Sequence, residues 1–296
     1  MDIAAYLEEK RQGVDQFLGS LFQGNQKSSS KLLESMRYSL LAGGKRIRPV
    51  LTLAAFDVCS LGKEKNDTAV LKIASAIEMI HTYSLIHDDL PAMDNDDLRR
   101  GRPTNHKAYG EAIAILAGDS LLTEAFGIIA KSGVDSKLLL EIVADIAEAS
   151  GSLGMAGGQA IDLESEGQKI TPKELETLHR LKTGCLIKVS VMAGAKMAGA
   201  QGQALKAMEV YGDRIGVAFQ IADDILDVEG GSKEMGKATG GDAAKNKATY
   251  PSIIGMEASK KMASTLCQEA IDALKIFETH AEPLREIASY IVGRRK

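Results

Sequence analysis

The sequence is poor in cysteine and carries little net charge. Its cysteines, Cys59, Cys185 and Cys267, are far apart and lie in apolar settings. An odd, unclustered set argues against a zinc site or a disulfide framework and is typical of reduced thiols packed as small apolar side chains in the cytosol. The net charge of −4 at pH 7 gives no reason to expect nucleic acid or an anionic membrane as a partner.

Targeting and membrane signals are also lacking. The opening residues, MDIAAYLEEKRQG, are acidic and interrupted by charge, so we expect neither a secretory signal nor a transit peptide. We expect no apolar run to be long enough to span a bilayer, and therefore no stable membrane insertion. Hydrophobic residues make up 45% and charged residues 26%, the balance of a soluble globular protein, which we expect to be cytoplasmic.

Proline is scarce, with six in the chain and none between Pro103 and Pro172. Alternating strand patterns are not evident. Apolar residues from Val14 to Phe22 recur at the spacing of an amphipathic helix. Apolar periodicity predicts further helices over 68–88, 203–227 and 257–277. The sequence therefore predicts an all-α protein.

One helix carries a clear start signal. Thr171 is a candidate N-cap, Pro172 stands at the first helical position, and Glu174 completes a capping box. Gly184 is a candidate end or kink of the same helix.

Two acidic clusters stand inside apolar stretches, in LIHDDLPAMDNDDLRRG (85–101) and QIADDILDVEG (220–230). Like charges at helical spacing repel, and burial of an unpaired carboxylate is costly, so a positive partner must compensate. Carboxylate oxygens without a nearby His or Cys cluster suit Mg²⁺, which binds through one or two carboxylates together with substrate phosphates. Solvated helix ends are the alternative for either cluster taken alone.

Basic residues with glycines accompany these clusters. GGKRIRP (43–49) places Lys45, Arg46 and Arg48 after two glycines, and Arg99 and Arg100 follow the first cluster. GKATGGD (236–242) follows the second cluster. Backbone N–H groups of glycine-rich loops and arginine forks both suit phosphate oxygens. A surface loop is the alternative for any one of them, whereas the set predicts a Mg²⁺-bound diphosphate.

The motifs GGKRIRP, DDLPAMDNDDLRRG, KTG, FQIADDILD and KATGGD resemble, in order and spacing, those of the trans-prenyl diphosphate synthases. The resemblance covers nearly the whole chain and is greatest to the bacterial members that make farnesyl diphosphate. It implies an isoprenoid-synthase helical bundle around a deep central cavity, as a single domain over residues 1–296, and usually a homodimer.

The resemblance also implies an activity. Isopentenyl diphosphate would be condensed head to tail with dimethylallyl and geranyl diphosphates to give farnesyl diphosphate, by ionisation, carbocation attack and proton loss. Two or three Mg²⁺ ions would serve each site, and Mn²⁺ could substitute. A geranylgeranyl diphosphate synthase of the same family is the alternative.

Residue roles follow from the same resemblance. It assigns the metal to Asp88, Asp89, Asp94 and Asp223, with Asp224 and Asp227 as catalytic neighbours. It assigns the allylic diphosphate to Arg99, Lys182, Gln220 and Lys237, with Thr183 nearby. It assigns isopentenyl diphosphate to Lys45, Arg48, His81 and Arg100. Without the resemblance, His81 is better interpreted as a core histidine.

Product length is predicted to depend on Tyr83, five residues before Asp88, with the small Ser84 beside it. A ring there can close the floor of the cavity, although a core tyrosine without substrate contact is the commoner case.

Three other classes remain open at this stage. A terpene cyclase would have no use for GGKRIRP or the Arg99–Arg100 pair, and a non-catalytic subunit would usually have lost aspartates. A Ca²⁺-binding helical protein would need a spaced ligand loop that ends in Glu.

Overall fold

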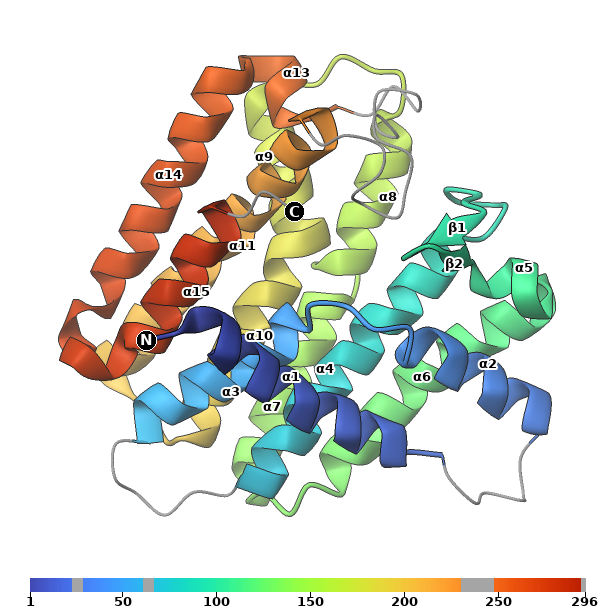
Figure 1. Ribbon diagram of the computed structural model, residues 1–296, viewed down its shortest axis with the longest axis horizontal. Helices are drawn as coiled ribbons and strands as arrows, with labels where there is room; N and C mark the ends of the chain where they lie inside the picture. The colour runs from blue at the N-terminus through green and yellow to red at the C-terminus, as the bar shows by residue number, and fades with distance from the viewer. Residues whose placement is uncertain (23–28, 61–66, 230–247, 294–296) are drawn as a thin grey trace.

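The computed structural model describes residues 1–22, 29–60, 67–229 and 248–293. Helices dominate this part of the chain, and the all-α prediction is confirmed (Figure 1). The elements are α1 Ile3–Ser20, α2 Ser30–Leu40, α3 Ile47–Ser60, α4 Asp67–Asp88, β1 Leu98–Arg99, β2 Arg102–Pro103, α5 Asn105–Tyr109, α6 Glu111–Ala130, α7 Ser136–Ser150, α8 Met155–Ser165, α9 Pro172–His179, the π-helix η1 Arg180–Gly184, α10 Cys185–Met197, α11 Gly202–Glu229, α13 Tyr250–Ile254, α14 Met256–Ala273, the 3₁₀ helix η2 Leu274–Ala281 and α15 Glu282–Gly293.

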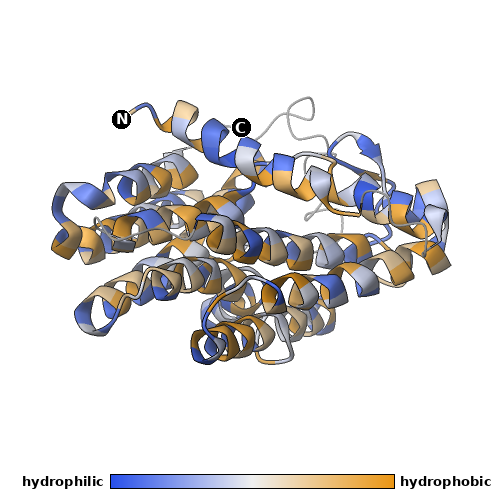
Figure 2. Ribbon diagram, turned by 90° about the horizontal axis from the view of Figure 1, so that it is seen from below, coloured by the Kyte–Doolittle hydropathy of each residue, from blue (hydrophilic) through white to orange (hydrophobic). Residues whose placement is uncertain are grey.

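The helices pack around two hydrophobic clusters. One joins α3, α10, α11, α14 and α15, and the other joins α1, α2, α4, α6, α7 and a second face of α10. Leu53 and Met197 pack against both clusters, so they lie where the clusters meet. In the view of Figure 2, α1 lies as an outer layer along one side of the bundle.

Local signals explain where several helices begin. Asp2 caps α1 by accepting from the backbone N–H of Ala4 and Ala5. The capping box predicted for α9 is present, because Thr171 and Glu174 bond each other's backbone N–H groups. Each such cap satisfies N–H groups that a helix start leaves unpaired.

Two predictions of helix ends need correction. The helix that starts at Pro172 does not end or kink out of helical geometry at Gly184, but continues through η1 into α10. The helix expected to reach residue 277 ends at Ala273 and becomes η2, where Glu278 has a φ of 48°. The side chain of Arg285 donates to the Leu274 carbonyl at 3.1 Å and so satisfies part of that helix end.

A short hairpin, β1–β2, also differs from the purely helical pattern (Figure 1). Its turn residues Arg100 and Gly101 have φ of 54° and 72°. Two successive positive φ values are typical of a tight hairpin turn, which suits the strand twist. The hairpin presents Arg99 and Arg100 beside the end of α4.

The expectation that no apolar run could span a membrane is wrong for two helices. Among the described residues, α4 and α6 are long and apolar enough by length and composition alone. In the apolar window of α4 67% of the residues are buried, against 33% in that of α6. The apolar window of each helix holds at most two charged residues, too few to interrupt the apolar run. The burial of α4 is that of a core helix.

Candidate active site

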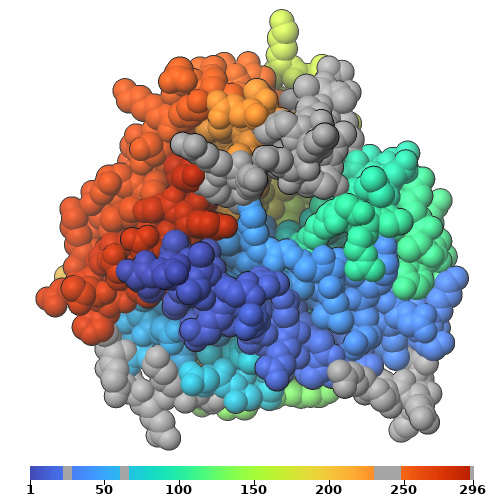
Figure 3. All heavy atoms as spheres, viewed as in Figure 1, coloured from blue at the N-terminus to red at the C-terminus, as the bar shows by residue number. Residues whose placement is uncertain are grey.

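A cavity of about 360 Å³ lies against the last turns of α4, and we call it the main cavity. Seven of the residues singled out in the sequence line it together: Arg48, His81, Tyr83, Ser84, Asp88, Lys182 and Thr183. They come from α3, α4 and η1, and α8 forms the remaining wall. The space-filling view is hollowed between the residues that lead into α3 and the β1–β2 hairpin (Figure 3).

The first acidic cluster forms where α4 ends. The chain folds back on the helix end, because the backbone N–H of Asp94 donates to the carbonyl of Asp88 at 2.8 Å. Asp88 and Asp94 are both half-buried. The pKa of Asp88 is raised to about 6, chiefly by burial and in addition by the nearby Asp94, while Lys182 opposes the rise. A cation beside these two carboxylates would offset the free-energy cost of keeping them charged in a half-buried position.

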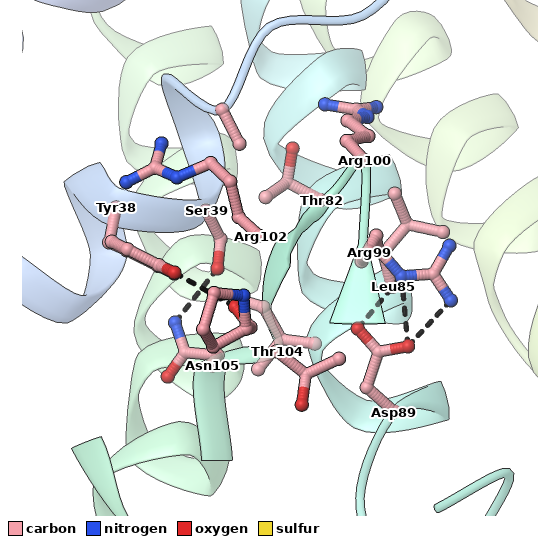
Figure 4. A pocket seen from close by; sticks show the side chains of 13 residues that line it. Tyr38, Ser39, Thr82, Leu85, Asp89, Arg99, Arg100, Arg102, Thr104 and Asn105 are labelled. Atoms are coloured by element: carbon pink, nitrogen blue, oxygen red, sulfur yellow. Dashed lines mark hydrogen bonds and ion pairs between the residues drawn. The ribbon is translucent and has the colours of Figure 1, made fainter. Parts of the chain in front are cut away.

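Unlike Asp88 and Asp94, Asp89 is paired with an arginine. Its side chain is almost fully buried and accepts from Arg99 Nε at 2.7 Å and from Arg99 Nη2 at 2.6 Å (Figure 4). Asp89, Arg99 and Arg100 line a small pocket of about 30 Å³ next to the hairpin. In this structure Asp89 therefore holds Arg99 in place, and its carboxylate is not open to a metal ion in the same way as that of Asp88.

The GGKRIRP loop is shaped by Arg100. Gly44 has a φ of 126°, and a Cβ added to it would lie 2.8 Å from Arg100 Cζ. The guanidinium of Arg100 also donates to the carbonyl of Gly43. The two glycines therefore let the loop backbone and the hairpin arginine touch. Lys45 in the same loop is exposed.

Arg46, by contrast, points into the protein. It has a φ of 50°, is 3% exposed, and donates to Glu78 at 2.8 Å, to Asp15 at 2.9 Å and to the Leu40 carbonyl at 2.7 Å. Its guanidinium ties α1 and α4 to the loop. The sequence-based grouping of Arg46 with the phosphate-binding cations is therefore wrong.

Arg48 and His81 face the main cavity from neighbouring helices. Burial lowers the pKa of Arg48, while Glu78 and Asp223 counteract it. The influence of Asp223 places α11 within electrostatic reach of this wall. Burial, together with Arg48, Arg100, Arg99 and Arg46, holds the pKa of His81 well below its usual value, so the imidazole is neutral. A neutral imidazole can still donate one hydrogen bond to a phosphate oxygen.

Part of the second acidic cluster is engaged in hydrogen bonds within the protein. Thr183 Oγ1 donates to Gln220 Oε1 at 2.8 Å, and Gln220 Nε2 donates to Asp224 Oδ1 at 2.8 Å. Asp224 is 2% exposed and also accepts from the backbone N–H of Tyr250 at 2.9 Å. It thus fixes Gln220. Asp223 and Asp227, one turn apart on α11, are half-buried.

Lys182 connects the two sides of the site. It lines the main cavity and also a pocket of about 70 Å³ that includes Gln220 and Asp224. Its Nζ donates to Asp162 Oδ2 at 2.6 Å. Sequence reasoning missed Asp162, together with Gln159 one turn before it on α8. Their signal was a Gln and an Asp three residues apart after the two glycines of GGQAID.

The carboxylate of Asp88 lines the main cavity, whereas Asp94 after α4 and Asp223 on α11 are not among the residues that line it. All three offer the hard oxygen ligands that suit Mg²⁺. Within residues 1–22, 29–60, 67–229 and 248–293, no three His, Cys, Asp or Glu side chains gather into a ready-made metal site. Lys237, assigned to the allylic diphosphate, lies outside the described residues.

This chain is similar to one protein family and to several known proteins. The family model described as polyprenyl synthetase matches residues 29–287. A farnesyl diphosphate synthase of Geobacillus stearothermophilus is 44% identical over 99% of this chain and 98% of its own. A geranylgeranyl diphosphate synthase of Cyanophora paradoxa is 46% identical over 99% of this chain and 97% of its own. A Helicobacter pylori geranyltransferase, solved with magnesium and isoprenyl diphosphate, has a TM-score of 0.86 at 32% identity, covering 99% of this chain and 97% of that one.

Proposed function

The chain belongs to the polyprenyl synthetase family, and on this premise we propose that it condenses isopentenyl diphosphate with dimethylallyl and then geranyl diphosphate to give farnesyl diphosphate. The observation that carries the proposal is the main cavity. Carboxylate, guanidinium and ammonium groups lie at the end of α4, and apolar residues of α8 line the same space. The charged groups suit a diphosphate, and the apolar residues suit a prenyl tail.

We assign the two diphosphates to different walls. Arg48, Lys45, Arg100 and the neutral His81 hold isopentenyl diphosphate. Lys182, Arg99 and Lys237 hold the allylic diphosphate, with Gln220 and Thr183 beside it. Asp88, Asp94 and Asp223 hold Mg²⁺, and Asp89 contributes through Arg99. When bound, Mg²⁺ supplies positive charge that offsets the charge of the departing diphosphate.

The chain's own residues then have distinct tasks. The cationic side chains stabilise the negative charge that grows on the leaving oxygen. The allylic C–O bond breaks, its electron pair leaves with the diphosphate, and the double bond of isopentenyl diphosphate attacks the cation. Proton loss completes a new allylic product, and the released diphosphate is the base. Met155 and Leu163 of the apolar wall exclude water that would quench the cation.

Incubation of the protein with Mg²⁺, dimethylallyl diphosphate and isopentenyl diphosphate tests the proposal directly. We expect a fifteen-carbon main product. A twenty-carbon product would favour the geranylgeranyl alternative, which the Cyanophora relative represents. A cyclic hydrocarbon would indicate a terpene cyclase, and no product in the presence of both substrates would contradict the proposal. A parallel reaction with Mn²⁺ tests metal substitution.

The two diphosphate sites can be separated by substitution. Arg48→Gln is expected to raise the KM for isopentenyl diphosphate, and Lys237→Gln that for the allylic substrate. Loss of one charge-assisted contact costs about 1.5–3 kcal/mol, or roughly tenfold to a hundredfold in apparent affinity. Initial rates with each substrate varied in turn measure both effects. Equal weakening of one substrate by both variants would contradict the assignment.

We further propose a cytoplasmic homodimer that associates through α6. Ile115 and Leu116 on this helix are 43% and 51% exposed, although α6 is apolar along most of its length. Large exposed apolar side chains on a helix that is only partly buried are typical of a protein interface.

Introduction of charge there tests the dimer. Leu116→Glu is expected to halve the mass measured by light scattering, because a buried unpaired carboxylate opposes association. Ile276→Glu is the matched control, since Ile276 is 52% exposed on η2. A Leu116→Glu protein of unchanged mass would place the interface elsewhere, and a monomeric wild type would refute the dimer.

A further inference from the structure

One polar side chain of the main cavity has no task in the scheme above. Gln159 on α8 is 8% exposed and lines the cavity. Among the described residues, neither its amide oxygen nor its amide nitrogen has a hydrogen-bond partner. Buried amides are nearly always paired, because an unpaired one costs stability. An unpaired amide that faces a substrate cavity is therefore a candidate for contact with the substrate.

The position of Gln159 is fixed by its neighbours in the sequence. A Cβ added to Gly158 would lie 2.2 Å from the backbone nitrogen of Lys182, so α8 touches the π-helix at this point. One turn after Gln159, Asp162 binds the ammonium of Lys182. These two contacts hold Gln159 at a set place relative to Lys182 and Thr183.

The surroundings of the amide decide which part of the substrate it meets. The other α8 residues that line the cavity are Met155, Ala156, Ala160 and Leu163, all apolar. The cations that line this cavity, Arg48 and Lys182, come from α3 and η1 instead. Gln159 is thus the one polar group on the α8 wall of this cavity, the wall that the prenyl part of the substrate would contact.

A prenyl chain in its ground state offers nothing to an amide. During ionisation, however, the C1–O bond breaks, the electron pair leaves with the diphosphate, and positive charge spreads over C1 and C3. The partial negative charge of an amide oxygen stabilises such a charge in a site that excludes water, without forming a bond.

We propose that Gln159 is a further catalytic residue, whose amide oxygen faces the allylic carbons and stabilises the cation as it forms. This inference rests on the proposed condensation activity. It predicts that Gln159 contributes to turnover and little to binding of the intact substrate, and that the protein keeps the unpaired amide at the expense of stability.

Gln159→Met tests the inference, because methionine has a similar length and no amide. We expect kcat for geranyl diphosphate and isopentenyl diphosphate to fall roughly tenfold to a hundredfold, as when one preorganised dipole is removed. The KM for isopentenyl diphosphate should stay within about twofold. Ile161→Met, on the same helix but not among the residues that line the cavity, is the matched control and should keep kcat within about threefold.

Two further measurements separate catalysis from structure. The Tm of Gln159→Met should equal or exceed that of wild type, since a buried unpaired amide is gone. Geranyl S-thiolodiphosphate, which ionises poorly, should bind both proteins equally, whereas an analogue with an ammonium nitrogen in place of C3 should bind the variant less tightly.

Three results would overturn the inference. The first is a kcat of Gln159→Met within about threefold of wild type. The second is a lower Tm of this variant together with equally weaker binding of both analogues, which would indicate a structural role. The third is unchanged binding of the ammonium analogue. A wild-type protein that makes no prenyl product would refute the proposed activity itself, which is a different outcome.

Discussion

Asp88→Asn is expected to lower kcat by roughly a hundredfold or more, the scale on which loss of one group that stabilises charge in the transition state acts. Asp88 ends α4 at the main cavity and is the carboxylate best placed to hold Mg²⁺ there. Asn keeps the shape and removes the charge. Because burial raises the pKa of Asp88 to about 6, the charge is costly in the metal-free protein, and the variant should melt no lower than wild type.

Asp223→Asn is expected to act in the same way from α11, which would show that both acidic clusters serve one step. Asp97→Asn is the matched control, since this aspartate of the same DNDD run is exposed and pairs with Lys107 on the surface. Steady-state rates at saturating Mg²⁺ measure all three. Turnover within a few fold of wild type for Asp88→Asn and Asp223→Asn would contradict the proposed ionisation.

Tyr83→Ala is expected to shift the main product from fifteen carbons to longer chains. Tyr83 lines the main cavity and lies five residues before Asp88, or roughly 7.5 Å back along α4. Its ring packs edge-on against His87, with the centroids 5.7 Å apart. Removal of the ring frees volume in the direction in which a growing tail must run, so elongation should stop later.

Chromatography of the dephosphorylated products measures the shift. Tyr83→Phe keeps the ring and should keep the wild-type length. Ser84→Ala should do the same, because Ser84 is too small to act as a floor and its hydroxyl is bonded to the His81 carbonyl at 2.9 Å. An active Tyr83→Ala enzyme with unchanged product length would place the floor elsewhere.

The features predictable from sequence were those carried by local spacing. The apolar run of α4 and the capping box of α9 depend on neighbours within one or two turns, and both are confirmed. The order of the motifs likewise predicted the family. The helix that was expected to reach residue 277 shows the limit of this reasoning, since Arg285, which donates to the Leu274 carbonyl at its end, lies beyond the periodic stretch.

Side-chain partners were not predictable, because tertiary packing chooses them. Arg46 and Arg48 are equivalent cations in the sequence, but a positive φ turns Arg46 inward to Glu78 and Asp15, while Arg48 lines the cavity. Gln159 gave no signal on its own. Its importance comes from what surrounds it, and the close approach of Gly158 to Lys182 cannot be read from either segment alone.

The π-helix between α9 and α10 affects how changes in chain length would act on the site. A π turn takes more residues than an α turn, so the helix before Arg180 and the helix after Gly184 are rotated relative to an unbroken α-helix. One residue corresponds to about 100° of helical phase. Deletion of a single residue here would regularise the helix, yet would rotate the face that carries Leu175 and Leu178 away from its partners in the core. The side chains of Lys182 and Thr183 would no longer line the cavity. In this segment the number of residues constrains the protein more tightly than their helical propensity does.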